Sequence, residues 1–233
     1  MPVHLVREID KLKQMMLSLA AMVEDNMRFA VKAVAERDPN LAQKVIARDH
    51  EIDRVEVEVE EECLKIFALH QPVANDLRFI VAILKINHDL ERIGDLAVNI
   101  AERAEEMSRF RQPAMRTDLL IMADVVQNMV SESIDAMINR DLKQARDIWL
   151  ADDEIDARNR AIHQDVGREI GEHPEHYETL LCLLSVSRNL ERIADHATSI
   201  AKDVIYMIEG EIVRHRSREF RAINSPQSHT PRP

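Results

Sequence analysis

The sequence predicts an all-α protein made of two tandem three-helix bundles that are related by internal duplication. Three observations predict it: a composition that favours helices, prolines that divide the chain into long periodic segments, and a motif that occurs twice. Aromatic residues make up 3% of the chain and it has four glycines, whereas 45% of the residues are hydrophobic. Long runs of Ala, Leu, Ile, Met, Glu and Arg favour helices over sheets, and 233 residues suffice for two domains.

Prolines mark the ends of the predicted helices. Pro39, Pro72, Pro113 and Pro174 lie between stretches in which apolar residues recur every three or four positions, and proline rarely continues a helix. The clearest seam begins at Leu119 and alternates spacings of three and four residues, which is typical of packed helices. We therefore expect six helices, in chain order over residues 5–37, 40–69, 75–109, 117–139, 141–171 and 178–213.

The duplication is visible in two motifs. Leu-Glu-Arg-Ile-Gly-Asp at 90–95 returns as Leu-Glu-Arg-Ile-Ala-Asp at 190–195, and Asp-His-Glu-Ile-Asp at 49–53 is echoed by Asp-Asp-Glu-Ile-Asp at 152–156. Two repeats in the same order at nearly the same offset indicate a duplicated unit. We predict a first bundle over 1–112 and a second over 113–215. The remainder, 216–233, is rich in Arg, Ser and Pro and is predicted to be a disordered tail.

Bulk properties exclude several classes of function. The net charge of −11 argues against nucleic-acid binding, because an acidic protein repels the phosphate backbone. The N-terminus has no apolar core of signal-peptide length, and the longest apolar run, 79–84, is far shorter than the roughly 20 residues that span a bilayer. Cys63 and Cys182 are interpreted as buried apolar residues in a reducing compartment. We therefore expect a cytoplasmic protein. The sequence contains no nucleotide-loop, nucleophile-elbow or zinc-protease motif, so these three kinds of chemistry have no motif support.

Four carboxylates in the first half are candidate metal ligands. Glu91 and Asp95 are four residues apart and lie on one face of their helix, and Asp49 and Asp53 share this spacing. A short loop around Pro72 should join the two helices in antiparallel orientation. The pairs Asp53–Glu91 and Asp49–Asp95 are each symmetric about Pro72. The two members of each pair should therefore face one another.

The second half repeats this arrangement. Asp152 and Asp156 pair with Asp195 and Glu191, and both pairs are symmetric about the bond that precedes Pro174. Two like charges ~4 Å apart repel by about 1 kcal/mol in water and about 4 at an effective dielectric of 20. The facing acids could be solvated helix faces whose side chains splay into water. The alternative is a hard cation that the carboxylate oxygens share.

Flanking positions differ between the halves. The first half offers further ligands at Glu56, Glu60, Asn99 and Glu102, and the matching positions of the second half hold Asn159, His163, Ser199 and Lys202. Lys202 brings positive charge toward the second cluster, so we expect the first site to hold metal more tightly. Arg92 and Arg192 could pair with the adjacent acids. The other histidines nearby are interpreted as surface or helix-end residues: His88, His173, His176 and His196.

Several stretches resemble the PhoU family of phosphate-transport regulators. They are QPVANDLR at 71–78, LERIGDLAVNIAE at 90–102 and NLERIADHA at 189–197, and the resemblance extends over nearly all of 5–215. It implies two three-helix bundles whose Asp/Glu-x-x-x-Asp motifs hold iron or zinc clusters. The ligands that it implies are Asp49, Asp53, Glu91 and Asp95, then Asp152, Asp156, Glu191 and Asp195. The chain departs from the family pattern at Ala194, Ser199 and Lys202, which again predicts lower occupancy of the second site.

The resemblance also implies a function. It implies a non-enzymatic negative regulator of the phosphate-starvation response, an adaptor between the ATPase subunit of the phosphate ABC transporter and a sensor histidine kinase. Such a protein meets the membrane only through its partners, and we expect a homodimer. Two alternatives stay open: a metal-independent accessory protein of another phosphate permease, and a carboxylate-bridged metalloenzyme. Co-purification with the ATPase or the kinase would favour the adaptor, and turnover at an open coordination position would favour the enzyme.

Overall fold

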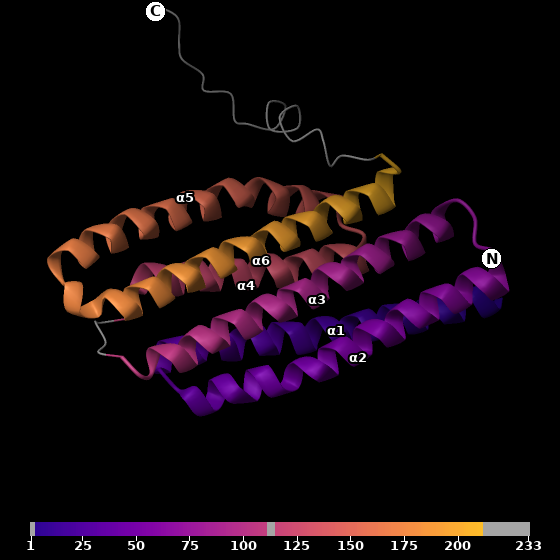
Figure 1. Ribbon diagram of the computed structural model, residues 1–233. Helices are drawn as coiled ribbons and strands as arrows, with labels where there is room; N and C mark the ends of the chain where they lie inside the picture. The colour runs from indigo at the N-terminus through magenta and orange to yellow at the C-terminus, as the bar shows by residue number, and fades with distance from the viewer. Residues whose placement is uncertain (1–2, 111–114, 212–233) are drawn as a thin grey trace, which may run out of the picture.

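The computed structural model describes residues 3–110 and 115–211, and these ranges contain six α-helices, as predicted (Figure 1). The helices are α1 (Val3–Glu36), α2 (Pro39–His70), α3 (Asn75–Met107), α4 (Thr117–Asn139), α5 (Leu142–Glu172) and α6 (Tyr177–Glu209). A short 3-10 helix, η1 (Pro174–His176), precedes α6 and was not predicted. The predicted boundary between 112 and 113 and the predicted tail, 216–233, lie outside the described residues.

Matching turns begin the second helix of each bundle. Arg37 and Arg140 both adopt positive φ, 59° and 53°, and each is followed by an aspartate that caps the next helix. Asp38 accepts hydrogen bonds from the backbone N–H groups of Asn40 and Leu41, and Asp141 accepts one from Gln144. Such caps stabilise helix starts by satisfying backbone N–H groups that have no partner within the helix. The repeated Arg-Asp turn is a third mark of the duplication.

The helices form two packed layers. In one layer α2, α3, α6 and α5 lie side by side in that order, and Figure 1 shows α1 and α4 behind them. The two bundles meet chiefly along α3 and α6. These helices run antiparallel, because Lys85 pairs with Asp203, whereas Asp89, one turn later in α3, pairs with the earlier residue His196 of α6. One hydrophobic cluster runs through both bundles. The two predicted bundles are therefore joined by a common core.

The predicted apolar seams face that core. Ile83, Ile86 and Leu90 of α3 and Leu183 and Leu190 of α6 are almost completely buried. None of the helices in the described ranges combines the length and the apolarity that a bilayer crossing requires.

The two cysteines are buried and free, as expected. Burial raises the pKa of the Cys63 thiol to about 12 and that of Cys182 to about 11. Because the thiolate is the reactive form, both side chains are inert at neutral pH.

Candidate metal centres

The first cluster of predicted ligands lies where α2 packs against α3. Burial, followed by the charges of Asp53 and Asp95, raises the pKa of Asp49 to about 6. An open groove of about 350 Å³ is lined by Asp53, Glu91 and Asp95, together with Glu56. Asp53 of α2 and Glu91 and Asp95 of α3 therefore line one groove, and Asp49 interacts electrostatically with Asp53 and Asp95.

The groove concentrates negative charge in a half-buried place. The pKa of Glu91 is raised by burial and then by Asp95, and that of Glu56 is raised by burial and then by Glu60. Asn87 holds Glu56 in position by donating from Nδ2 to its Oε1, at 3.1 Å, and to its backbone oxygen, at 2.9 Å. A raised pKa means that the fold disfavours the charged carboxylate, which a bound cation would reverse.

Arg92 pairs with the first cluster, as the sequence analysis considered. Its Nε lies 3.3 Å from Glu91 Oε2 and its Nη1 lies 3.0 Å from Asp95 Oδ2. His88 Nδ1 is 3.7 Å from the same glutamate oxygen. Glu91 Oε2 is nevertheless buried and accepts no hydrogen bond, because the arginine contact lacks hydrogen-bond geometry. A buried acceptor without a donor is a position that a cation would satisfy, so the residues fit a metal ion.

The second cluster lies where α5 packs against α6. The pKa of Asp152 is raised by burial, then by Asp195 and Asp156, and that of Glu191 is raised by burial and then by the same two acids. Burial followed by the charge of Asp156 also raises the pKa of Asp195. All four predicted acids of the second cluster therefore act on one another.

Two cationic or donor groups distinguish this second cluster. Lys202 lowers the pKa values of Asp152 and Asp195, and Thr198 Oγ1 donates to Asp152 Oδ1 at 3.3 Å. The ammonium group of Lys202 lies 5.3 Å from the centre of the buried Trp149 ring, within range of a cation–π interaction. The lysine that the sequence singled out therefore acts on the acids.

The other flanking candidates divide into two groups. Glu56 lines the first groove, and the charge of Glu60 raises the pKa of Glu56 after burial does. Asn99 does not line that groove, and Glu102 lies 3.7 Å from Arg103 instead. In the second half, Asn159 accepts a hydrogen bond from Ser187 at 2.7 Å, whereas His163 has a lowered pKa through burial and the charge of Arg188.

The eight carboxylates are not assembled into a coordination shell. Within residues 3–110 and 115–211, one group of three His, Cys, Asp or Glu side chains has its ligand atoms within 4.8 Å of one another, and it is His173, Glu175 and His176 in the turn before α6. Like charges about 4 Å apart repel by about 4 kcal/mol at an effective dielectric of 20, which opposes a closer approach of these acids without an ion. A bound ion would have to draw the oxygens inward.

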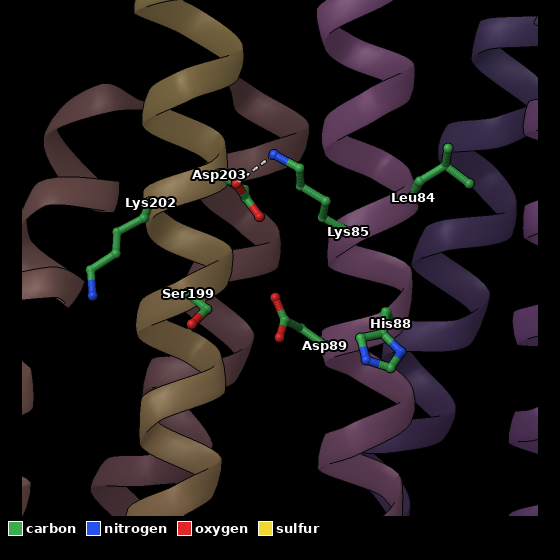
Figure 2. Close-up of a pocket in the computed structure, with 7 residues that line it drawn as sticks. All are labelled: Leu84, Lys85, His88, Asp89, Ser199, Lys202 and Asp203. Carbon is green, nitrogen blue, oxygen red and sulfur yellow. Dashed lines mark hydrogen bonds and ion pairs between the residues drawn. The ribbon is translucent and has the colours of Figure 1, made fainter. Parts of the chain in front are cut away.

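A groove between the bundles lies beside both clusters. It has a volume of about 580 Å³ and is lined by Leu84, Lys85, His88, Asp89, Ser199, Lys202 and Asp203. Figure 2 shows Asp89 and Ser199 on opposite walls and Lys85 extending to Asp203. His88 also contacts Glu91 of the first cluster, and Lys202 acts on the second. This groove could not be predicted from the sequence, because neither the repeat nor the hydrophobic periodicity specifies how the two bundles pack together.

Comparison with known proteins assigns the family. The PhoU domain model matches residues 16–104 and 119–204. A phosphate-specific transport system accessory protein PhoU homolog of Pseudomonas putida is 35% identical over 209 residues, covering 89% of this chain and 82% of that protein. The homolog of Aquifex aeolicus is 36% identical over 214 residues, covering 91% and 96%.

Solved structures give the same result for the fold. The crystal structure of PhoU from Pseudomonas aeruginosa is 33% identical in sequence, superposes with a TM-score of 0.85, and covers 88% of this chain and 99% of that one. The two matched domains, the six helices and the identity over most of both chains agree with the resemblance seen in the sequence. The chain belongs to the PhoU family of phosphate-transport accessory and regulatory proteins, which are not enzymes.

Proposed function

We propose that this chain acts in the cytoplasm as a negative regulator of the phosphate-starvation response. In this proposal it is an adaptor between the ATPase subunit of a phosphate ABC transporter and a sensor histidine kinase. The names of its relatives, which connect them with phosphate-specific transport, support the physiological part of the proposal. The adaptor would meet the membrane only through these partners. The homodimer stays a prediction.

We further propose that both carboxylate clusters bind iron or zinc. The observation that carries this part is the pair of half-buried acidic clusters, each made by two packed helices of one bundle. In the first, Asp49, Asp53, Glu91 and Asp95 would hold the ion, and in the second Asp152, Asp156, Glu191 and Asp195 would do so. A multivalent cation shared between two helices neutralises the facing acids and ties the helices together.

One observation favours the metal-independent alternative. Arg92 already neutralises part of the first cluster through Glu91 and Asp95. Under that alternative, replacing Arg92 by Gln should destabilise the protein, because the acids lose their cation. Under the metal-binding proposal the same variant should bind metal at least as tightly as the parent, because an internal competitor has been removed. Metal titration and thermal melting of Arg92→Gln separate the two.

Deletion of the gene tests the regulatory proposal. Phosphate-starvation genes should be switched on in phosphate-rich medium, and the wild-type gene on a plasmid should restore repression. Pull-down of the tagged protein in high and low phosphate should recover the transporter ATPase or the kinase. If the starvation genes stay repressed after deletion, this chain is not the regulator.

Metal analysis of the purified native protein tests the metal sites independently. The variant D49N/D53N/E91Q/D95N should lose the metal of the first site. Glu58→Gln provides a matched control, because Glu58 is an exposed acid of the same helix α2 that does not line the groove. Equal metal content in both variants and the parent would contradict the assignment of these ligands.

A further inference from the structure

The turn between α5 and α6 carries a compact group of potential metal ligands. His173 follows the last residue of α5, and Glu175 and His176 belong to η1. Their ligand atoms lie within 4.8 Å of one another, which holds for no other such trio in the described parts of the chain. Sequence analysis interpreted both histidines as surface or helix-end residues. Their position at a helix end is confirmed, but this does not explain why the three side chains converge.

The backbone of the turn holds the three residues in place. The N–H of His173 donates to Glu169 at 2.8 Å, and that of His176 donates to His173 at 3.0 Å. Pro174 begins η1, and its ring fixes one backbone torsion. The spacing of the three residues along the backbone is therefore set by two consecutive hydrogen-bonded turns.

The side chains themselves are already oriented toward one another. His173 Nδ1 lies 3.3 Å from Glu175 Oε1, and the two imidazole rings are 5.8 Å apart between centroids with a tilt of 36°. The Nδ1 atom of His176 is buried and has no hydrogen-bond partner. A buried ring nitrogen without a partner is a polar atom that a metal ion can satisfy.

The donor set selects a class of ion. Two imidazoles and one carboxylate suit zinc and the other late first-row divalent metals, whereas magnesium and calcium take mostly oxygen ligands. Three protein ligands leave a fourth tetrahedral position for water or another small ligand. The carboxylate clusters differ in consisting of oxygen donors alone. They also lie far away: Asp156 precedes the end of α5 by about 16 residues, or roughly 25 Å along the helix.

We propose that His173, Glu175 and His176 form a zinc-type divalent metal site that ties the end of α5 to the start of α6. The first bundle has no equivalent, because its corresponding turn contains one histidine, His70, and no acid between His70 and Asn75. The site does not depend on the proposed regulatory function. It does not require metal in either carboxylate cluster.

Zinc titration of the full-length, metal-stripped protein in excess magnesium tests the proposal. Isothermal calorimetry counts the sites, and the imidazole signals in nuclear magnetic resonance report which histidines bind. We expect the signals of His173 and His176 to shift together with one zinc equivalent. H173A/H176A should lose that equivalent or bind it at least about tenfold more weakly, because two of three ligands are gone.

Two further variants complete the experiment. Glu175→Gln should weaken zinc binding at the turn while leaving both imidazole signals resolved, which keeps the test valid if the double variant folds poorly. His70→Ala is the matched control in the equivalent turn and should bind zinc like the parent. Unshifted His173 and His176 signals at saturating zinc, or an unchanged zinc count in H173A/H176A, would overturn the proposal. Either result would place the bound zinc outside this turn.

Discussion

The two carboxylate clusters occupy equivalent places in their bundles but are neutralised differently. In the first, Arg92 contacts Glu91 and Asp95 from the same helix, and its side chain is 48% exposed. In the second, Lys202 acts on Asp152 and Asp195 while it lies over the buried Trp149 ring. An exposed arginine can swing into water when a metal arrives, whereas the lysine is held beside its acids by the indole. Duplication has kept the acids and the arginine, since Arg192 also lowers the pKa of Asp195, and the second cluster has Lys202 in addition.

This comparison predicts unequal metal content in Asp95→Asn and Asp195→Asn. The first substitution should remove most of the bound metal, because it disables the site whose internal cation is easily displaced. The second should remove less, because Lys202 already weakens the attraction of that cluster for a cation. Metal per chain, measured by mass spectrometry on protein purified identically, checks this. Equal losses, or a larger loss from Asp195→Asn, would show that the internal cation does not set occupancy.

The raised pKa of Asp49 predicts that pH affects stripped and loaded protein in opposite directions. Because the pKa of Asp49 is about 6 in the folded protein, whereas the ordinary value of an aspartate is 3.8, the folded state binds this proton more tightly than the unfolded state. Stripped protein should therefore lose stability as pH rises from about 4 to 6, and the loss persists above 6. Loaded protein should show the reverse, since metal binds the deprotonated carboxylates and is released as they become protonated at low pH.

Asp49→Asn isolates this effect. Stripped D49N should be more stable than the stripped parent at pH 7, by on the order of 1 kcal/mol, because water screens a partly exposed carboxylate. The two proteins should have equal stability near pH 4, where Asp49 is protonated in the folded state. Thermal melting across this range measures both. A stability difference that does not change with pH would mean that the substitution acts through packing.

The sequence was sufficient for most of the fold and for the grouping of the acids. Long helices with regular seams are recognisable from periodicity, and a helix rises 1.5 Å per residue, so symmetry about Pro72 places Asp53 opposite Glu91 without further information. The path of long side chains was not predictable. Arg92 and Arg192 are each preceded by glutamate and followed by isoleucine, so the sequence around them does not distinguish the two clusters. The difference lies in Lys202, whose ammonium group lies over the Trp149 ring, and this position became visible only in the structure.

Contacts between the two bundles could not be predicted from the sequence either. The ion pairs Lys85–Asp203 and His196–Asp89 join the bundles at 3.4 and 2.8 Å. They depend on how α3 packs against α6, which neither the hydrophobic pattern nor the duplication determines. The convergence of His173 and His176 depends on η1, a local turn that helix-boundary signals do not resolve.

Lys202→Gln tests whether the lysine lowers the metal affinity of the second cluster. Removing the positive charge should increase the metal affinity of that site several-fold, because a unit charge near a partly exposed carboxylate contributes about 1 kcal/mol or more. Lys143→Gln is the control, because Lys143 is an exposed lysine of α5 that pairs with Asp147, outside the cluster. Titration of stripped protein that carries Asp95→Asn together with H173A/H176A isolates the second site. Unchanged affinity would mean that the lysine does not compete with metal.

The smallest effect is expected at the glycine of the first motif. The residue equivalent to Gly94 in the second half is Ala194. A methyl group at position 94 would lie 3.4 Å from Ile52 Cγ2 and 3.5 Å from Asp49 Oδ1, which are ordinary van der Waals distances. Packing alone therefore does not require glycine at this position in α3. Gly94→Ala should stabilise the stripped protein by up to about 1 kcal/mol through helix propensity.

Metal binding by Gly94→Ala decides what the glycine contributes to the difference between the clusters. The methyl group would touch the oxygen of Asp49 that faces α3, but it leaves all four acids and Arg92 in place. If the internal cations account for unequal occupancy, the variant should melt slightly higher and keep the metal content of the parent. A higher melting temperature with less metal would instead mean that Asp49 needs the open space beside Gly94 to turn toward an ion. Ala194 would then limit the second site together with Lys202, and Ala194→Gly combined with Lys202→Gln would be needed to raise its occupancy to that of the first.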